Sequence, residues 1–207
     1  MAIIFLGLTT LVTRGLFFPT DATRYNWIWL GLSGVIGFFL GDLFLFKSYT
    51  VIGARTAALI MSLAPMLTAV IGWFFLDEIL NAKSIVAILL SVSGIMIVIA
   101  NKNLKLNIPF KGFLLAFGGA LGQAVGLILS KKGMGDYDPV AATQIRAIFG
   151  ITCFVVFITL VGRWDKVLSA VRDRQSMKSV TVGTVYGPFS GVALGLLEIK
   201  NTKTGIA

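Results

Sequence analysis

Long apolar segments alternate with short polar ones along the chain. Seven apolar segments are separated by polar or charged residues, and they cover roughly residues 1–18, 27–46, 57–76, 84–100, 112–130, 140–162 and 180–197. Each is close to the length of roughly 20 residues with which an α-helix crosses the hydrocarbon core of a bilayer. A chain in lipid must satisfy its own backbone hydrogen bonds, so helices are the expected form. The pattern predicts an all-α polytopic membrane protein with seven transmembrane helices.

The first apolar segment has a second interpretation, a secretory signal peptide. No basic residue precedes its apolar run, Arg14 stands at its far end, and no small-residue cleavage site follows. A signal peptide carries its charge before the apolar run and a cleavage site after it. These departures favour a transmembrane helix that begins at Met1.

Composition and charge agree with a membrane protein. The chain is 57% hydrophobic and 13% charged, and its mean hydropathy is +0.90. Soluble domains are less apolar and carry about twice as many charged residues. The net charge is +9, but the basic residues stand singly or in small groups between apolar segments. That placement is typical of anchors at the membrane edge, so we expect a lipid bilayer and no nucleic acid as partners.

The residue types that usually carry catalysis are scarce. The chain has no histidine, and its single cysteine, Cys153, lies inside an apolar segment. A disulfide framework and the commonest metal ligand are therefore missing. The sequence also has no Walker A motif, which cradles nucleotide phosphates in many ATP-driven proteins. We expect no metal, no cofactor and no enzymatic activity.

The stretch from Gly53 to Ala100 carries the most informative motif. Leu63-Ala64-Pro65 interrupts an apolar segment that ends in Leu76-Asp77-Glu78, and a second apolar segment containing Gly94 follows. A proline inside a membrane helix is tolerated where neighbours or water accept the freed carbonyl. We therefore expect Pro65 to face the inside of the bundle. The order and spacing of these residues resemble the second half of an EamA-type repeat of the drug/metabolite transporter superfamily.

The resemblance implies a secondary active transporter. Such a protein would export a small organic metabolite across the inner (plasma) membrane by alternating access, driven by protons or by exchange of substrate. The oligomeric state is open between a monomer and a homodimer. The alternative function is a non-transporting membrane subunit or a degenerate transporter fragment.

Internal similarity predicts two repeats. Thr10–Arg14 matches Thr159–Arg163 and Arg55-Thr56 matches Lys203-Thr204, at separations of 149 and 148 residues. Agreement between the two separations indicates repeats at 1–104 and 105–207. By the resemblance, the first repeat lacks its first helix and the second lacks its last two. Five helices in each complete repeat would give the two repeats opposite orientations, as in many transporters.

Two charged residues lie inside predicted membrane segments. Asp42 falls in the segment 27–46, and Arg146 falls in the segment 140–162. A charge inside the bilayer costs several kcal/mol unless it is paired or hydrated, and it commonly marks a transport pathway. We expect both to face a substrate cavity, where Arg146 would hold an anionic group or pair with an acid. The alternatives are an interfacial Asp42 and an Arg146 that snorkels to the interface.

Four further residues are candidates for the lining of this cavity. Gln123 lies in the middle of its segment and needs a polar partner, on another helix or in the cavity. Ser62 and Pro65 share one helical face, and Tyr186 interrupts the last apolar segment. The predicted substrate cavity contains Asp42, Ser62, Pro65, Gln123, Arg146 and Tyr186.

Glycines recur at every fourth position in three segments. This spacing lets the backbones of two membrane helices approach closely. It predicts helix packing, or alternatively a sliding surface for a rocking motion, at Gly37, Gly41, Gly118, Gly122, Gly126, Gly183, Gly187, Gly191 and Gly195.

The connection at 163–178 separates the last two apolar segments. Trp164, Val167, Leu168 and Val171 recur there at helical spacing. This pattern predicts either a short amphipathic helix on the membrane surface or a solvated connector.

Overall fold

Every regular element in the described part of the structure is a helix. The computed structural model describes residues 2–76, 82–100, 109–173, 177 and 183. Within these residues, three helical stretches are long and apolar enough to cross a membrane: Arg24–Met61, Phe110–Met134 and Pro139–Val161. The predicted all-α membrane protein is confirmed. The count of seven spans stays a prediction, because the segment 180–197 lies outside the described residues except for residue 183.

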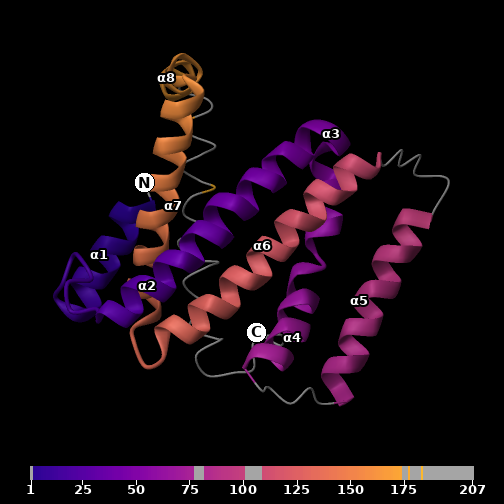
Figure 1. The fold of residues 1–207 in the computed structure, drawn as a ribbon, viewed down its shortest axis with the longest axis horizontal. Helices are drawn as coiled ribbons and strands as arrows, with labels where there is room; N and C mark the ends of the chain where they lie inside the picture. The colour runs from indigo at the N-terminus through magenta and orange to yellow at the C-terminus, as the bar shows by residue number, and fades with distance from the viewer. Residues whose placement is uncertain (1, 77–81, 101–108, 174–176, 178–182, 184–207) are drawn as a thin grey trace.

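The first six apolar segments coincide with helices. Figure 1 shows their arrangement, and their bounds are α1 Ala2–Arg14, α2 Arg24–Ser33, η1 Gly34–Gly41, α3 Asp42–Met61, α4 Ala64–Phe75, α5 Ala82–Ala100, α6 Phe110–Met134 and α7 Pro139–Val161, followed by α8 Trp164–Arg172. The element η1 is a π-helix, a wider turn than the α-helix. It continues α2 into α3 without a loop.

The chain reverses direction inside α3. At 38 residues, Arg24–Met61 is far longer than one span needs. Gly53 adopts φ 77° and ψ 155°, a backbone conformation open almost only to glycine. Figure 1 shows the chain turning at the upper end of α3 and descending toward α4. The glycine therefore ends one crossing and begins the next.

The descending helix is interrupted where the sequence predicts. Helix α3 ends at Met61, two residues follow in turn conformation, and α4 begins at Ala64 with Pro65 in its first turn. Proline suits that position because the first amides of a helix have no intrahelical partner. Pro65 is exposed in the described structure. Its expected position on the inside of the bundle stays a prediction.

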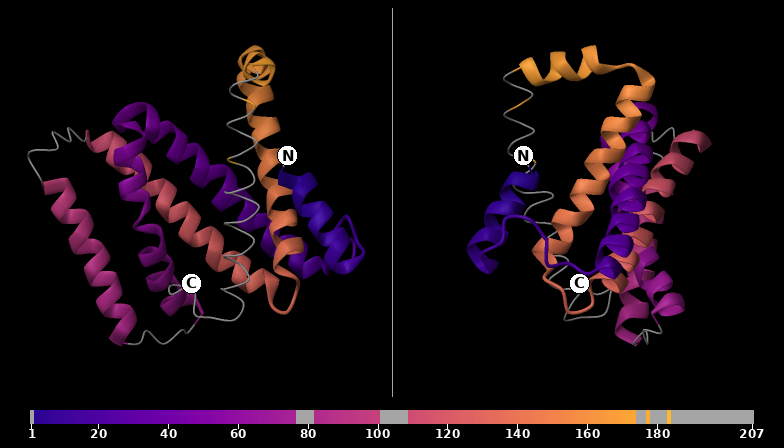
Figure 2. Two further views of the ribbon diagram at one scale, coloured as in Figure 1. Left: turned by 180° about the vertical axis from the view of Figure 1, so that it is seen from behind. Right: turned by 60° about the vertical axis from the view of Figure 1, so that its left-hand side comes forward.

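Helix α6 lies at the centre of the described bundle. It packs against α2, η1, α3 and α4, whereas α7 packs against α1, α2 and η1. Figures 1 and 2 show α5 at the far edge of this arrangement, away from α7. Both η1 and α2 contact α6 on one side and α7 on the other, so residues 24–41 lie between the two long helices.

Glycines bring η1 and α6 into backbone contact. A Cβ placed on Gly126 would lie 2.7 Å from Gly37 Cα, and one on Gly122 would lie 2.9 Å from Gly41 Cα. Gly118, on the same helix, instead faces the Phe44 ring, where a Cβ would lie at an ordinary 3.5 Å. A Cβ on Gly183 would meet nothing within 4 Å. Gly187, Gly191 and Gly195 lie outside the described residues.

Local sequence signals explain how α7 begins and ends. The Asp138 side chain accepts a hydrogen bond from the Ala141 amide, and Pro139 follows it in the first turn. Gly162 then ends the helix in the left-handed conformation, the usual role of glycine at that point. After this turn α8 runs across the end of α7 (Figure 2).

The helix α8 is amphipathic, and its apolar side chains are exposed. Trp164, Leu168 and Val171 are among them. The Trp164 indole N–H donates to Thr159 Oγ1 at 3.3 Å, so its ring turns back along α7. The location of α8 on a membrane surface stays a prediction.

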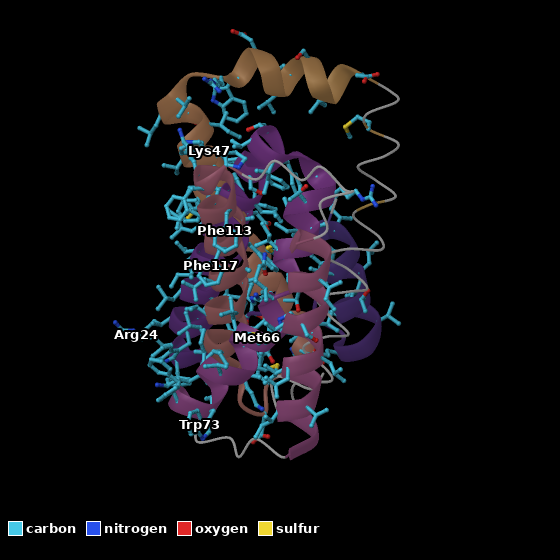
Figure 3. All side chains as sticks on the ribbon, turned by 90° about the vertical axis from the view of Figure 1, so that its right-hand side faces the viewer. Arg24, Lys47, Met66, Trp73, Phe113 and Phe117 are labelled. Carbon is cyan, nitrogen blue, oxygen red and sulfur yellow. The ribbon has the colours of Figure 1, made fainter. Side chains whose placement is uncertain are left out.

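Aromatic side chains fill the space between α6 and the reversed part of α3. Phe113 and Phe117 stack with centroids 6.0 Å apart (Figure 3), and they pack against the buried Ala57, Ile60 and Ala116. Figure 3 also shows Lys47 near one end of the bundle and Trp73 near the other. The apolar middle is thus bounded by residues typical of membrane edges.

The glycine contacts predict unequal effects of the same substitution at two positions of α6. Gly126→Ala would force η1 and α6 apart, and we expect it to lower the free energy of unfolding in detergent by about 2 kcal/mol. Gly118→Ala adds the same methyl group where space exists, so it should cost nothing. Titration with a denaturing detergent measures both. Equal effects would contradict the backbone contact.

Candidate functional site

Three helical elements meet around Gly37. A Cβ on Gly34 would lie 2.3 Å from the Arg146 carbonyl oxygen, so η1 and α7 touch through their backbones. On its other side η1 touches α6 at Gly122 and Gly126, as described above. Such close approach leaves little room between the helices. Polar side chains on all three elements are consequently brought to one place.

Gln123 links α6 to η1 and to the start of α3. Its Nε2 donates to Asp42 Oδ1 at 2.9 Å, and it also lies 3.4 Å from the Gly37 carbonyl oxygen. Asp42 itself is half-buried. The sequence predicted a partner for Gln123 either on another helix or in the cavity. In the structure the partner, Asp42, is on another helix, α3. The bond supplies a neutral donor to the Asp42 carboxylate and leaves its charge in place.

Arg146 is fully buried, with 0% of its surface exposed. Its Cζ lies 4.5 Å from the centroid of the Phe38 ring, in a cation–π arrangement. A Cβ on Gly37 would lie 3.4 Å from Arg146 Nη2, which places the guanidinium beside the same glycine that Gln123 approaches. The side chain does not snorkel toward an interface. It points into the junction of η1, α6 and α7.

The guanidinium lacks the partners that a buried charge normally has. Within the described structure, Arg146 Nε, Nη1 and Nη2 make no hydrogen bond, and no ion pair joins Arg146 to Asp42. A buried donor without an acceptor costs about 1–3 kcal/mol, and a charged one costs more. The junction therefore contains an acid and a base of opposite charge that do not neutralise each other directly.

The structure brings together three of the six predicted cavity residues: Asp42, Gln123 and Arg146. Ser62 and Pro65 are exposed at the interruption between α3 and α4, and the Ser62 hydroxyl donates to the Leu59 carbonyl at 2.6 Å. Tyr186 lies outside the described residues.

Sequence reasoning missed the serines that extend the glycine contact. Ser33 Oγ donates to the Gly126 carbonyl at 2.6 Å and lies 2.8 Å from Ser130 Oγ. Ser33 precedes Gly37 by four residues, and Ser130 follows Gly126 by four. The separation of four residues between small side chains therefore indicated this contact in the sequence. Serine, like glycine, is small enough to let two helices approach closely.

A second polar cluster, absent from the sequence predictions, joins distant segments. Arg14 pairs with Asp21 and lies 4.8 Å over the Tyr137 ring, while Tyr137 Oη donates to Asp21 Oδ1 at 2.9 Å. Burial raises the pKa of Asp21, but the hydrogen bonds from Tyr137 and Arg14 outweigh it and hold the pKa below its ordinary value. The cluster connects the end of α1 and the loop after it to the connection between α6 and α7.

A further contact attaches the same loop to α7. Gln144 Nε2 donates to the Phe17 carbonyl at 2.9 Å, and the Thr10 hydroxyl approaches that oxygen at 3.5 Å. Both side chains are buried. These bonds attach the α1–α2 loop to α7 at Gln144, two residues before Arg146.

The described helices hold a buried arginine and a half-buried aspartate between them, and the known proteins that this chain resembles are described as transporters. The model of the EamA-like transporter family matches residues 1–100. The uncharacterized transporter YyaM of Bacillus subtilis (strain 168) is similar to this chain, with 26% identity over 135 residues. That similarity covers 63% of this chain and 43% of the relative, so it spans less than half the relative's length.

These matches confirm the resemblance predicted from the Pro65 motif and support a membrane transporter. The family match ends at residue 100, and the division into repeats at 1–104 and 105–207 stays a prediction. Both matches refer to transporters and neither to an enzyme.

The bond between Gln123 and Asp42 predicts energetic coupling between α6 and α3. In a double-mutant cycle of Asp42→Ala and Gln123→Ala, we expect the two losses of unfolding free energy to be non-additive by about 1 kcal/mol, the range of interhelical hydrogen bonds in membranes. Titration with a denaturing detergent provides the four free energies. Additive losses would show that the bond contributes nothing.

Proposed function

We propose that this chain acts in secondary active transport, exporting a small organic metabolite across the inner (plasma) membrane by alternating access. The observation that carries the proposal is the unpaired Arg146, buried in a helix junction that also contains Asp42. Charges inside membrane proteins are expensive and usually serve a pathway for a solute or an ion. The EamA-like match and the transporter relative support the same class.

The glycine contact between η1 and α6 also suits the helix movements that alternating access needs. Glycine-on-glycine contact between η1 and α6 involves backbone and few interlocking side chains. Such a surface can slide with less repacking than an interdigitated one. The π-helical turn of η1 adds a second feature, because π-turns occur frequently at functional sites. We infer that α6 and α7 shift against η1 when access changes sides.

The driving force would come from a proton gradient or from exchange of solutes. The sequence contains no Walker A motif. Asp42 is the candidate to carry a proton, since its carboxylate is half-buried and has a neutral amide for a partner. Two chains in a homodimer would each have such a site.

Transport by the purified 207-residue chain tests the proposal. In proteoliposomes loaded with a mixture of metabolites, we expect release of at least one solute above the rate of protein-free liposomes. Arg146→Gln should reduce that release at least tenfold, since a tenfold loss corresponds to only about 1.4 kcal/mol of lost binding. The released solutes are identified by mass spectrometry.

Arg24→Gln is the matched control, because Arg24 is also an arginine but is exposed at the start of α2. It should leave release unchanged. No release by the parent protein would favour the non-transporting subunit, and equal release by Arg146→Gln would remove Arg146 from the pathway.

A further inference from the structure

We propose that a groove between α3 and the first turns of α6 binds an anionic phospholipid, with one acyl chain in the groove and the phosphate at Lys111. The groove has a volume of about 240 Å³, and its lining consists of Phe44, Lys111, Leu114, Leu115 and Gly118. These residues belong to α3 and α6 alone, so the groove lies outside the junction of η1, α6 and α7. A lipid site there goes beyond the transport function and is independent of it.

A glycine among larger side chains creates the groove. Four lining residues come from α6 and have the spacing of one helical face: Lys111, Leu114, Leu115 and Gly118. Gly118 has no side chain, and a Cβ there would lie 3.5 Å from the Phe44 ring. The glycine therefore leaves a depression that its larger neighbours border. Unlike the two later glycines of its series in α6, Gly118 faces a side chain of the other helix and leaves space beside it.

The groove opens on the apolar outer surface of the helices. Phe44 is 40% exposed and Leu114 is 57% exposed, and both belong to stretches long and apolar enough to cross a membrane. On another face of α6, Phe113 and Phe117 pack against the reversed part of α3 (Figure 3). Lipid tails are as apolar as leucine. An acyl chain therefore suits this exposed and almost wholly apolar lining.

Lys111 places a positive charge where the groove reaches the end of the membrane helix. It is the second residue of α6 and precedes Gly118 by seven residues, which is about 10 Å along a helix. Its side chain is exposed and makes no ion pair within the described residues. The first turn of α6 contains no acidic residue. Lys47 of α3 is also exposed, near the same end of the bundle (Figures 1 and 3).

Charge complementarity selects an anionic headgroup. Basic residues close to a membrane surface attract anionic lipids, and the two lysines at this end have no acid beside them to cancel their charge. A second copy of the chain suits the groove less well, because it would need an acidic residue on a lipid-facing surface. The described acidic residues lie in loops or at helix ends, apart from Asp42, whose carboxylate is bonded to Gln123. A phospholipid supplies both the apolar chain and the negative charge.

Binding of lipids to the full 207-residue chain in a non-ionic detergent tests this site. The probes are dioleoyl phosphatidylglycerol, dioleoyl phosphatidylcholine, which has the same chains without net charge, and glycerol 3-phosphate, which has no chains. Native mass spectrometry measures the dissociation constant of the first bound lipid. We expect phosphatidylglycerol to bind about tenfold more tightly than phosphatidylcholine, since each lysine at a membrane surface contributes about fivefold. Glycerol 3-phosphate should give no stable adduct.

Substitutions separate the headgroup from the chain. Lys111→Gln should weaken phosphatidylglycerol about fivefold and leave phosphatidylcholine unchanged, because only the charge is removed. Gly118→Leu fills the groove and should weaken both lipids about tenfold. The matched controls are Arg24→Gln, at an exposed arginine of α2, and Gly94→Leu, at an exposed position of α5 where a Cβ meets nothing within 4 Å. Neither control should change the binding of either lipid.

A photoreactive lipid locates the site on the parent chain and needs no variant to fold. Phosphatidylglycerol with a diazirine in one acyl chain should crosslink to Phe44 and to residues 114–118, as mapped by peptide mass spectrometry. Crosslinks spread evenly over the exposed apolar residues of α5 and α7 would overturn the site.

Other results would also contradict an anionic lipid in this groove. These are equal affinity of the parent chain for the two phospholipids, adducts of glycerol 3-phosphate as stable as those of the lipid, and equal losses for Gly118→Leu and Gly94→Leu. A chain that forms dimers and shows no crosslink in the groove would indicate that a second copy covers it.

Discussion

Backbone contact between η1 and α6 is the constraint on which the described structure depends. Gly37 meets Gly126 and Gly41 meets Gly122 so closely that a Cβ on Gly122 or Gly126 would lie within 3.0 Å of the facing backbone. At this separation the polar groups of one helix come within hydrogen-bonding reach of the other, as Ser33 and Gln123 show. In lipid, where burial of apolar surface gives no force between helices, close packing and such bonds supply the association. The polar junction and the tight packing are therefore two results of one contact.

The sequence was sufficient to predict most of the helices and part of the junction. Apolar segments of membrane length identify the spans, and the interruption near Pro65 follows from the chemistry of proline. Asp42, Gln123 and Arg146 could be selected because each is polar inside an apolar segment. Their convergence could not be predicted, because it depends on the rotation of three helices about their axes. In η1 the π-helical turn also changes this rotation, so α-helical spacing misplaces the residues that follow Gly34.

Contacts between distant loops could not be predicted from the sequence either. Arg14, Asp21 and Tyr137 are ordinary surface residues when read singly, and 116 positions separate Tyr137 from Asp21. Nothing in local spacing relates them. Their cluster forms only because α1 packs on α7 and the loops at that end then meet. The same holds for Gln144. Its hydrogen bond to the Phe17 carbonyl forms only when α1 and the loop after it lie against α7.

The π-helix has a consequence for how this junction could arise or disappear in evolution. A π-turn accommodates one residue more than the α-helical turn it replaces, so a single-codon insertion can create it and a deletion can erase it. Because the wider turn absorbs the extra residue, the helical segments before and after it can keep the same faces toward α6. Gain or loss of that residue would change which side chains of Gly34–Gly41 point into the junction and leave Asp42 beside Gln123. The π-helix thus allows the composition of the junction to change by one residue while the helices around it stay packed as they are.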